Sequence, residues 1–273
     1  MKNLEGKVAV VTGGGSGIGR ELALACAREG MNVVLADVDV KGMDETGQLI
    51  GSALKVRCDV SRAAEVENLA LETYDRFGAA HLLFNNAGVA VSGPTWTTTL
   101  EEWEWVLGVN LMGVVHGIRT FVPRMLAQGG ECHVVSTASA AGLISVPGSS
   151  VYCVSKHGVV TMSECLKHEL RRAKASIGVS VLCPAYVKTG IVDSTRNRPP
   201  ELAKDNPLGA PYREGVRKAV ESGRLSAAEV AKLTLDAVKA DRFYVIPHAK
   251  MKAHVETRLQ DIVQEREPTD VTP

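Results

Sequence analysis

The sequence carries no net charge, since Lys and Arg together total 31 and Asp and Glu also total 31 among 273 residues. Without a basic excess the chain creates no broad positive field, so we expect no binding to nucleic acid or to an anionic membrane. A long hydrophobic run near the amino end is lacking too, because residues 8–11 are far too few for a signal peptide core or a membrane span. These absences favour a cytoplasmic protein.

Paired cysteines are also missing. The six cysteines form no C-x-x-C pair and have no histidine at metal-ligand spacing, and several fall in apolar runs. This pattern favours free core thiols in a reducing compartment over disulfides. The histidines at 116, 133, 157 and 168 likewise match no metal-binding spacing with nearby carboxylates, so we expect no metal site.

Short apolar runs rich in β-branched residues alternate along the whole chain with longer segments of helical period. The runs predict strands at 8–11, 33–36, 54–57, 81–84, 133–136, 179–182 and 243–246. The first six are almost continuously apolar, as expected for strands covered on both faces. Strand and helix alternation of this kind predicts an α/β fold, with a single doubly wound parallel sheet of about seven strands flanked by helices, of Rossmann type.

No linker, repeat or low-complexity tract divides the sequence, so we expect residues 1–273 to form one domain. Residues 190–225 lack a clear period and hold four prolines among many charges. An insertion this long in a compact domain indicates a substrate lid, with a merely solvated loop as the alternative. The polar tail after residue 264 contains two prolines and is expected to be frayed.

A glycine-rich turn, T-G-G-G-S-G-I-G at 12–19, lies between the first strand and a helix. Glycines there let a pyrophosphate approach the unpaired N–H groups of the helix N-terminus, which predicts a dinucleotide site. Asp37 ends the second strand, where a carboxylate can accept hydrogen bonds from ribose hydroxyls and would repel a 2′-phosphate. Neither Ser16 nor Val38 offers a compensating cation, so NAD is favoured over NADP.

Further motifs follow in order along the chain. Asp59-Val60 comes after the third strand, N-N-A-G at 85–88 after the fourth, and Asn110 lies in a helical segment. Ser139 follows the fifth strand and precedes by 13 positions a Y-x-x-x-K motif, which is followed by P-A-Y-V-K-T at 184–189. In this order the motifs resemble those of the short-chain dehydrogenase/reductase family, over nearly the whole chain to about residue 246. Two departures are Ala185, where the family usually has glycine, and Thr137-Ala138, where a serine is commoner.

The resemblance implies a role for each matching residue. The catalytic residues it implies are Asn110, Ser139, Tyr152 and Lys156. The cofactor-binding residues it implies, together with those of the glycine turn, are Gly13, Ser16, Gly17, Ile18, Gly19, Asp37, Asp59, Val60, Asn86, Ala87, Gly88, Tyr152, Lys156, Pro184, Val187 and Thr189. By the same resemblance Asn110 holds a water that links Lys156 to solvent, and Thr189 contacts the nicotinamide carboxamide.

Tyr152 and Lys156 are four residues apart, so a helix places them on one face. Hydride transfer from an alcohol needs a base for the hydroxyl proton, and a phenol with a pKa near ~10 is a poor base at neutral pH. A unit charge at ~4 Å with an effective dielectric constant of ~20 favours phenolate by about 4 kcal/mol, or roughly 3 pK units at most. Lys156 and an oxidised nicotinamide are therefore expected to bring the phenol into a working range, while Ser139 holds the substrate oxygen.

The expected substrate is a hydrophobic secondary alcohol or ketone, such as a steroid or aryl alcohol. The residues expected to surround it are apolar or aromatic and are Val89, Val91, Leu143, Val146, Pro184 and Tyr186. The lid could add Arg196 or Arg198, and the three tryptophans are expected to serve packing or subunit contacts. The sequence thus predicts an NAD-dependent oxidoreductase acting on a CH–OH group.

Several alternatives remain at this point. One is an NADPH-dependent carbonyl reductase, and another is a non-catalytic regulator that senses NADH, although such a protein would not need both Tyr152 and Lys156. A sugar-nucleotide epimerase would need a larger carboxyl-terminal domain than fits after Pro184. The resemblance also implies a homo-oligomer, either a tetramer or a dimer, packed through the helices around 101–127 and 150–172.

Overall fold

The computed structural model describes residues 1–204 and 206–271. Asp205, within the expected lid, and the last two residues of the tail lie outside the described residues. The seven strands are β1 (Val8–Thr12), β2 (Asn32–Asp37), β3 (Ala53–Arg57), β4 (Leu82–Asn85), β5 (Cys132–Thr137), β6 (Ile177–Leu182) and β7 (Tyr244–Val245). Each overlaps a predicted strand, because its apolar run is bounded by polar or glycine-containing turns.

These strands form one parallel sheet in the order β3-β2-β1-β4-β5-β6-β7. The chain builds the half with β1, β2 and β3 first and then crosses to β4 beside β1. This reversal of direction defines a doubly wound sheet, whose ligands bind in the crevice at the carboxyl ends of the strands next to the switch point. The predicted fold class is confirmed.

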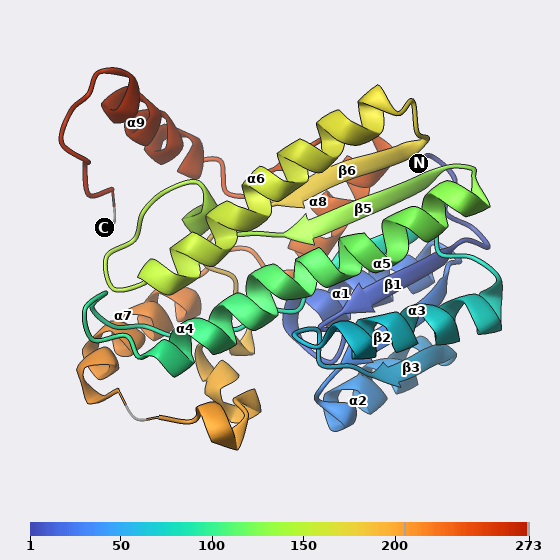
Figure 1. Ribbon diagram of the computed structural model, residues 1–273, viewed down its shortest axis with the longest axis horizontal. Coiled ribbons are helices and arrows are strands. Elements are labelled where there is room, and N and C mark those ends of the chain that lie inside the picture. Colours follow the sequence, from blue (N-terminus) through green and yellow to red (C-terminus); the bar gives the residue numbers. More distant parts are fainter. Residues whose placement is uncertain (205, 272–273) are drawn as a thin grey trace.

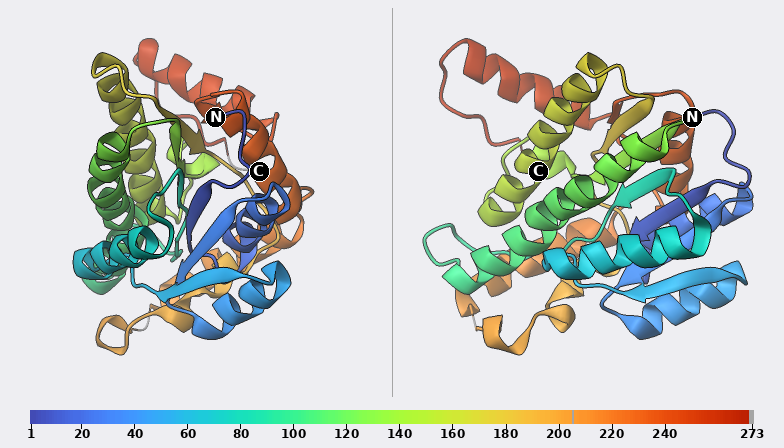
Figure 2. Two further views of the ribbon diagram at one scale, coloured as in Figure 1. Left: turned by 90° about the vertical axis from the view of Figure 1, so that its right-hand side faces the viewer. Right: turned by 45° about the vertical axis from the view of Figure 1, so that its right-hand side comes forward.

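Helices cover both faces of the sheet (Figures 1 and 2). The α-helices within the described residues are α1 (Gly17–Arg28), α2 (Val40–Ile50), α3 (Ala63–Phe77), α4 (Leu100–Leu107), α5 (Gly113–Gln128), α6 (Ser150–Arg172), α7 (Ala210–Glu221), α8 (Ala227–Lys239) and α9 (Met251–Val263). Helices α3, α5 and α6 lie on one face, and α1, α2 and α8 lie on the other.

The hydrophobic core lies in two main layers, one on each side of the sheet. Along β1, Ala9 and Val11 pack into the layer below α1 and α8, whereas Val8 and Val10 pack into the layer below α3 and α5. Both layers need apolar side chains, which explains why the central strands are continuously apolar rather than alternating.

One strand departs from this prediction. β3 is the edge strand, and its Lys55 and Arg57 side chains are exposed and form ion pairs with Asp44 and Glu65. Only one side of β3 has a neighbouring strand, so charged side chains there remain in contact with water. The expectation of two covered faces therefore holds for the inner strands and is wrong for β3.

The stretch Leu100–Gln128 is long and apolar enough, by length and composition alone, to cross a membrane. It comprises α4, a π-helical turn (η1, Gly108–Met112) and α5, and half of its apolar window is buried inside the fold. Phe121 and Met125 of α5 are fully buried in the core layer shared with α3. This packing is typical of a core helix in a globular domain.

Candidate active site

The glycine turn after β1 leaves no room for side chains. A Cβ added to Gly19 would lie 2.0 Å from the carbonyl oxygen of Gly13, and one added to Gly13 would lie 2.8 Å from Cα of Ala87. Gly13 also has a φ of +68°, in the left-handed region that favours glycine. Ser16 precedes α1 with its hydroxyl free of any capping bond. The turn is thus shaped for a backbone-bound phosphate at the N-terminus of α1.

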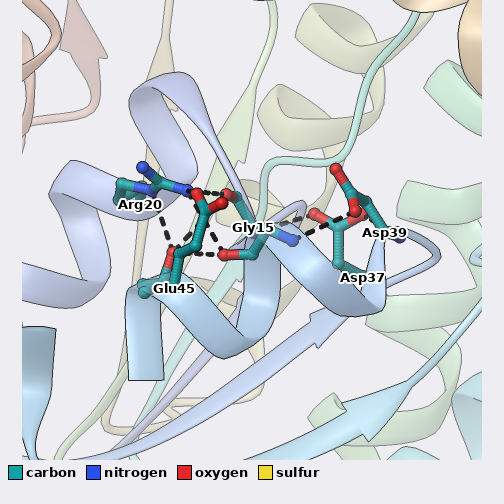
Figure 3. A network of polar contacts seen from close by, with 7 residues as sticks. Gly15, Arg20, Asp37, Asp39 and Glu45 are labelled. Atoms are coloured by element: carbon teal, nitrogen blue, oxygen red, sulfur yellow. Dashed lines mark hydrogen bonds and ion pairs between the residues drawn. The ribbon is translucent and has the colours of Figure 1, made fainter. Parts of the chain in front are cut away.

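The carboxylate of Asp37 is fixed at the end of β2. Its two oxygens accept hydrogen bonds from the backbone N–H groups of Gly15 (2.8 Å) and Asp39 (2.9 Å). Burial raises the pKa of this carboxyl, and the two backbone bonds oppose the shift. Figure 3 shows Arg20 on the other side of Gly15, where it donates to the Gly15 carbonyl (2.7 Å) and to Glu45 (2.9 Å). Arg20 therefore forms an ion pair with Glu45 and not with Asp37.

The N-N-A-G segment is tied to the glycine turn through one hydroxyl. Oγ1 of Thr12 accepts hydrogen bonds from the backbone N–H groups of Asn86 (2.9 Å) and Ala87 (3.1 Å). The Asn86 amide donates to the carbonyl of Thr12 (3.0 Å) and accepts from Thr137 (3.2 Å). These bonds hold the ends of β1, β4 and β5 together at the switch point.

Asn110 lies within the π-helical turn η1 and is fully buried. Its Oδ1 accepts from the backbone N–H of Val89 (2.8 Å), and its Nδ2 donates to the Val89 carbonyl (2.9 Å) and to Ser155 Oγ (3.1 Å). Both amide hydrogens are therefore used within the protein. The Asn110 amide therefore has no hydrogen left over for a water.

Ser139, Tyr152 and Lys156 meet at the carboxyl end of β5. Ser139 Oγ accepts from the Ala141 N–H (3.2 Å) and donates to the Pro184 carbonyl (3.3 Å), and it lies near enough to the Tyr152 phenol to lower the pKa of that group. The Lys156 ammonium donates to the Thr137 carbonyl (2.9 Å) and lies 5.6 Å from the centre of the Tyr152 ring. The helical spacing thus gives the expected arrangement of a serine, a phenol and an ammonium.

The protonation of this group differs from expectation. Burial raises the pKa of the Tyr152 phenol to about 12, and the nearby Ser139 hydroxyl only partly opposes the shift. Burial also lowers the pKa of Lys156 to about 8. The expectation that Lys156 brings the phenol into a working range is therefore not met by the protein alone, because the loss of hydration on burial is the largest cause of both pKa shifts.

The segment after β6 closes the cleft over the glycine turn. A Cβ added to Gly17 would lie 3.2 Å from Cγ2 of Thr189, so these two residues are in contact across the cleft. The backbone N–H of Ala185, at the position where the family usually has glycine, donates to Nδ1 of His248 (3.1 Å). His248 comes from the segment after β7, and sequence reasoning missed it because no local pattern indicates this long-range contact.

The residues expected at the site line one cleft of about 720 Å³, with a single exception. Asp59 and Val60 lie in its wall, as do Gly88, Pro184 and Val187. Asn110 does not, because it is buried behind the cleft wall at Val89.

The expected substrate lining is largely present, with one correction. Val89, Val91, Val146 and Tyr186 line the cleft, but Leu143 packs instead with the core cluster around Val159. The prediction for Leu143 is wrong because the short 3₁₀ turn Ala140–Gly142 directs the chain back onto α6. The tryptophans also differ from one another, since Trp105 is buried at the cleft wall whereas Trp96 is 86% exposed.

Residues 190–225 cover the apolar end of the cleft. They form short 3₁₀ turns and then α7, so the segment is folded rather than an open loop. Ser194, 4% exposed, accepts from the Ala90 N–H (2.9 Å) and donates to the Ala90 carbonyl (3.1 Å). Arg196 lines the cleft, whereas Arg198 stacks on Trp105 and faces Glu102.

The tail after α9 also reaches this end. Arg266 pairs with Asp261, the Thr269 N–H donates to the same carboxylate (3.0 Å), and Val271 lines the cleft. The described part of the tail, expected to be frayed, is thus held by hydrogen bonds and folds back to the cleft. Within residues 1–204 and 206–271, no three His, Cys, Asp or Glu side chains are close enough to hold a metal ion.

The chain is similar to many known proteins. Residues 7–200 match the family model for short chain dehydrogenases. A crystal structure of a short-chain dehydrogenase/reductase from Burkholderia phymatum in complex with NAD superposes with a TM-score of 0.97 at 45% identity, covering 100% of both chains.

Curated relatives cover nearly the whole length as well. A CLA biosynthesis dehydrogenase/reductase from Lactiplantibacillus plantarum is 30% identical over 98% of this chain and 97% of its own. A 1-deoxy-11-beta-hydroxypentalenate dehydrogenase from Streptomyces exfoliatus is 33% identical over 95% of this chain and 90% of its own. The chain therefore belongs to the short-chain dehydrogenase/reductase family of oxidoreductases, which bind nicotinamide cofactors.

Proposed function

We propose that the protein is an NAD-dependent dehydrogenase that interconverts a hydrophobic secondary alcohol and its ketone. The observation that carries this proposal is the meeting of Ser139, Tyr152 and Lys156 in the same cleft as the glycine turn. That arrangement supplies a hydrogen-bond partner for a substrate oxygen, a proton donor and acceptor, and a cofactor-binding turn in one place.

In the proposed mechanism Ser139 Oγ holds the substrate oxygen by a hydrogen bond. The Tyr152 oxygen, near the same serine, takes the hydroxyl proton during oxidation and returns it to the carbonyl oxygen during reduction. A bound nicotinamide supplies the acceptor or donor of the hydride. When it is protonated, Lys156, held by the Thr137 carbonyl, favours the ionised form of the nearby phenol.

We assign Asn110 a positioning role. Its side chain forms two hydrogen bonds with the backbone of Val89 and donates a third to Ser155, one residue before Lys156. These bonds fix the helix that carries Tyr152 relative to the strand ends. The proton taken up by Tyr152 then reaches solvent through Lys156.

The preference for NAD rests on Asp37. Its carboxylate lines the cleft with both oxygens fixed by backbone N–H groups, so it can accept from ribose hydroxyls and would repel a 2′-phosphate. The nearby Arg20 is paired with Glu45 and does not offset that repulsion. The glycine turn itself fits a dinucleotide, because a Cβ at Gly13 or Gly19 would fill the space.

The decisive experiment measures NADH formation from NAD⁺ with a panel of secondary alcohols, and NADH oxidation with the matching ketones. We expect turnover by the wild type and a loss of about 10²–10⁴-fold in kcat for Tyr152→Phe, the range typical of removing a general acid–base group. NADH binding, followed by fluorescence, should be unchanged in this variant. Turnover that survives in Tyr152→Phe would reject the mechanism, and NADH binding without turnover by the wild type would favour a regulator.

The same assay addresses cofactor choice, since faster initial rates with NADPH than with NADH would favour a carbonyl reductase.

We also propose a homo-oligomer in a reducing cytoplasm. In support, all six cysteines are free, and α9 exposes Leu259, Ile262 and Val263 at its carboxyl-terminal end. Light scattering coupled to gel filtration distinguishes a dimer or tetramer from a monomer.

A further inference from the structure

The apolar end of the cleft carries two cations that the mechanism does not use. Arg224 lies just after α7, and Lys250 immediately precedes α9. Both line the cleft, together with Val216, Val220 and Met251. Two segments far apart in the sequence therefore bring positive charge to a wall that is otherwise mainly apolar.

Backbone contacts bring the segments that carry these two cations close to Tyr186. Val187 pairs with Leu225 in an isolated parallel bridge, and Gly223 approaches the Tyr186 carbonyl so closely that a Cβ on it would lie 2.6 Å away. This packing sets Arg224 beside Tyr186. The bond from Ala185 to His248 and the helical contact from Met251 N to the His248 carbonyl (2.9 Å) place Lys250 next to the same turn.

Neither cation has an acidic partner among residues 1–204 and 206–271. Of the other basic residues in the lid, Arg217 pairs with Asp193, whereas Arg196, which also lines the cleft, donates to the backbone carbonyls of Gly190 and Asp193. Two exposed cations left unpaired at an apolar cleft favour a ligand that brings its own negative charge.

The acidic residues that line the cleft do not neutralise Arg224 and Lys250. Asp37, Asp39 and Asp59 follow β2 and β3, in the half of the sheet that holds the glycine turn, and Glu104 comes from α4. Arg224 and Lys250 instead adjoin the segment after β6, which is separated from β2 and β3 by β1, β4 and β5 in the sheet. The cleft thus has an acidic end for the adenosine half of a cofactor and a basic, apolar end.

We propose that Arg224 and Lys250 bind the carboxylate of an amphipathic substrate whose apolar body lies along the valines of the cleft. The alcohol or ketone that reacts at Tyr152 is then part of a hydrophobic hydroxy or oxo acid rather than a neutral alcohol. This inference rests on the proposed function, since it names the class of substrate for the same site. It also adds two cations to the apolar and aromatic lining expected from the sequence.

Calorimetry with the protein saturated with NAD⁺ tests the proposal without turnover, using decanoate and decanol as probes. We expect decanoate to bind about tenfold more tightly than decanol, or about 1.4 kcal/mol, because two exposed charge pairs contribute together. The double variant Arg224→Gln, Lys250→Gln should lose this preference. Lys252→Gln, an exposed lysine of α9 that does not line the cleft, is the matched control and should keep it.

Equal affinity for the two probes, no binding of either, or a preference that survives in the double variant would each overturn the proposal. Turnover separates this failure from failure of the proposed function. If neutral alcohols such as 2-decanol react as well as 9-hydroxydecanoate, the carboxylate site is rejected and the dehydrogenase stands. If the coenzyme A thioester of the hydroxy acid is preferred over the free acid, the cations serve carrier phosphates and the carboxylate assignment is wrong.

Discussion

The phenol of Tyr152 and the amine of Lys156 share one buried space, so we expect their protons to be coupled. Burial raises the pKa of Tyr152 to about 12 and lowers the pKa of Lys156 to about 8, so both groups favour their neutral forms. The first proton therefore leaves the pair near pH 8, and the pair can then exist as phenol with amine or as phenolate with ammonium. Only the second form can take a proton from an alcohol.

A pH dependence follows from these directions. Alcohol oxidation should rise as the pH increases through about 8, because the pair must lose one proton first, whereas ketone reduction should fall over the same range. In Lys156→Met the proton must come from the phenol itself, so the rise should move to higher pH, toward 12. Profiles of kcat/KM at saturating cofactor test this, with NADH fluorescence confirming binding. Identical profiles for wild type and variant would contradict the coupling.

At this scale the sequence predicts the chemistry-bearing residues well, because each belongs to a local motif. Tyr152 and Lys156 are four apart on a helix, and Asp37 ends an apolar run. Ser194 and His248 were missed because their partners are 104 and 63 residues away, at Ala90 and Ala185. Ionisation could not be predicted either, since the pKa depends on burial that only the folded chain creates.

Among the elements, residues 190–225 and the π-helical turn form hydrogen bonds with the backbone of two consecutive residues, Val89 and Ala90. Asn110 binds the backbone N–H and carbonyl of Val89, and Ser194 binds the same two groups of Ala90. Val89 and Ala90 both line the cleft. Residues 190–225 are therefore connected to the helix that carries Tyr152 through two consecutive residues.

Replacing Ser194 by Ala should loosen the lid. The half-buried backbone groups of Ala90 would lose the two hydrogen bonds that hold residues 190–225 against them, so we expect that segment to open more often. We expect KM for the alcohol to rise roughly tenfold with a smaller change in kcat, together with faster proteolysis within residues 190–225.

Thr195→Ala is the control, because the neighbouring Thr195 is exposed and its side chain makes no hydrogen bond among the described residues. It should leave KM and the proteolysis rate unchanged. If Ser194→Ala behaved like this control, the contact with Ala90 would have no role in lid closure.

The elements differ in how well their sequences reveal them. The central strands are predicted to within about two residues because both of their faces are buried. In α7 and α9 only Val220 and Asp261 are buried, so no apolar stripe marks these helices. Edge strand β3 was found, but its exposed face was not, because its place in the sheet depends on the order of all the strands.

On the scale of the whole molecule, the cleft lies across the switch point and joins both halves of the sheet. Asp37 belongs to the first half and Tyr152 to the second, and both line the same cleft. A dinucleotide that fills it must contact both halves, so its binding stabilises the folded state as a unit. By mass action, a ligand at 100 times its Kd adds about 2.7 kcal/mol to the free energy of unfolding.

Thermal unfolding can therefore report both the cleft and the choice of cofactor. A gain of about 2.7 kcal/mol should raise Tm by about 5 °C or more for a chain of this length. NAD⁺ should give this shift in the wild type, and NADP⁺ at the same concentration a smaller one, because the fixed Asp37 carboxylate repels its phosphate.

Asp37→Asn keeps an acceptor for the Gly15 N–H but removes the charge, so NADP⁺ should then stabilise the protein nearly as much as NAD⁺. Asp44→Asn, which neutralises an exposed carboxylate of α2 outside the cleft, should retain the wild-type difference. Equal shifts with both cofactors in the wild type would show that Asp37 does not select against the 2′-phosphate.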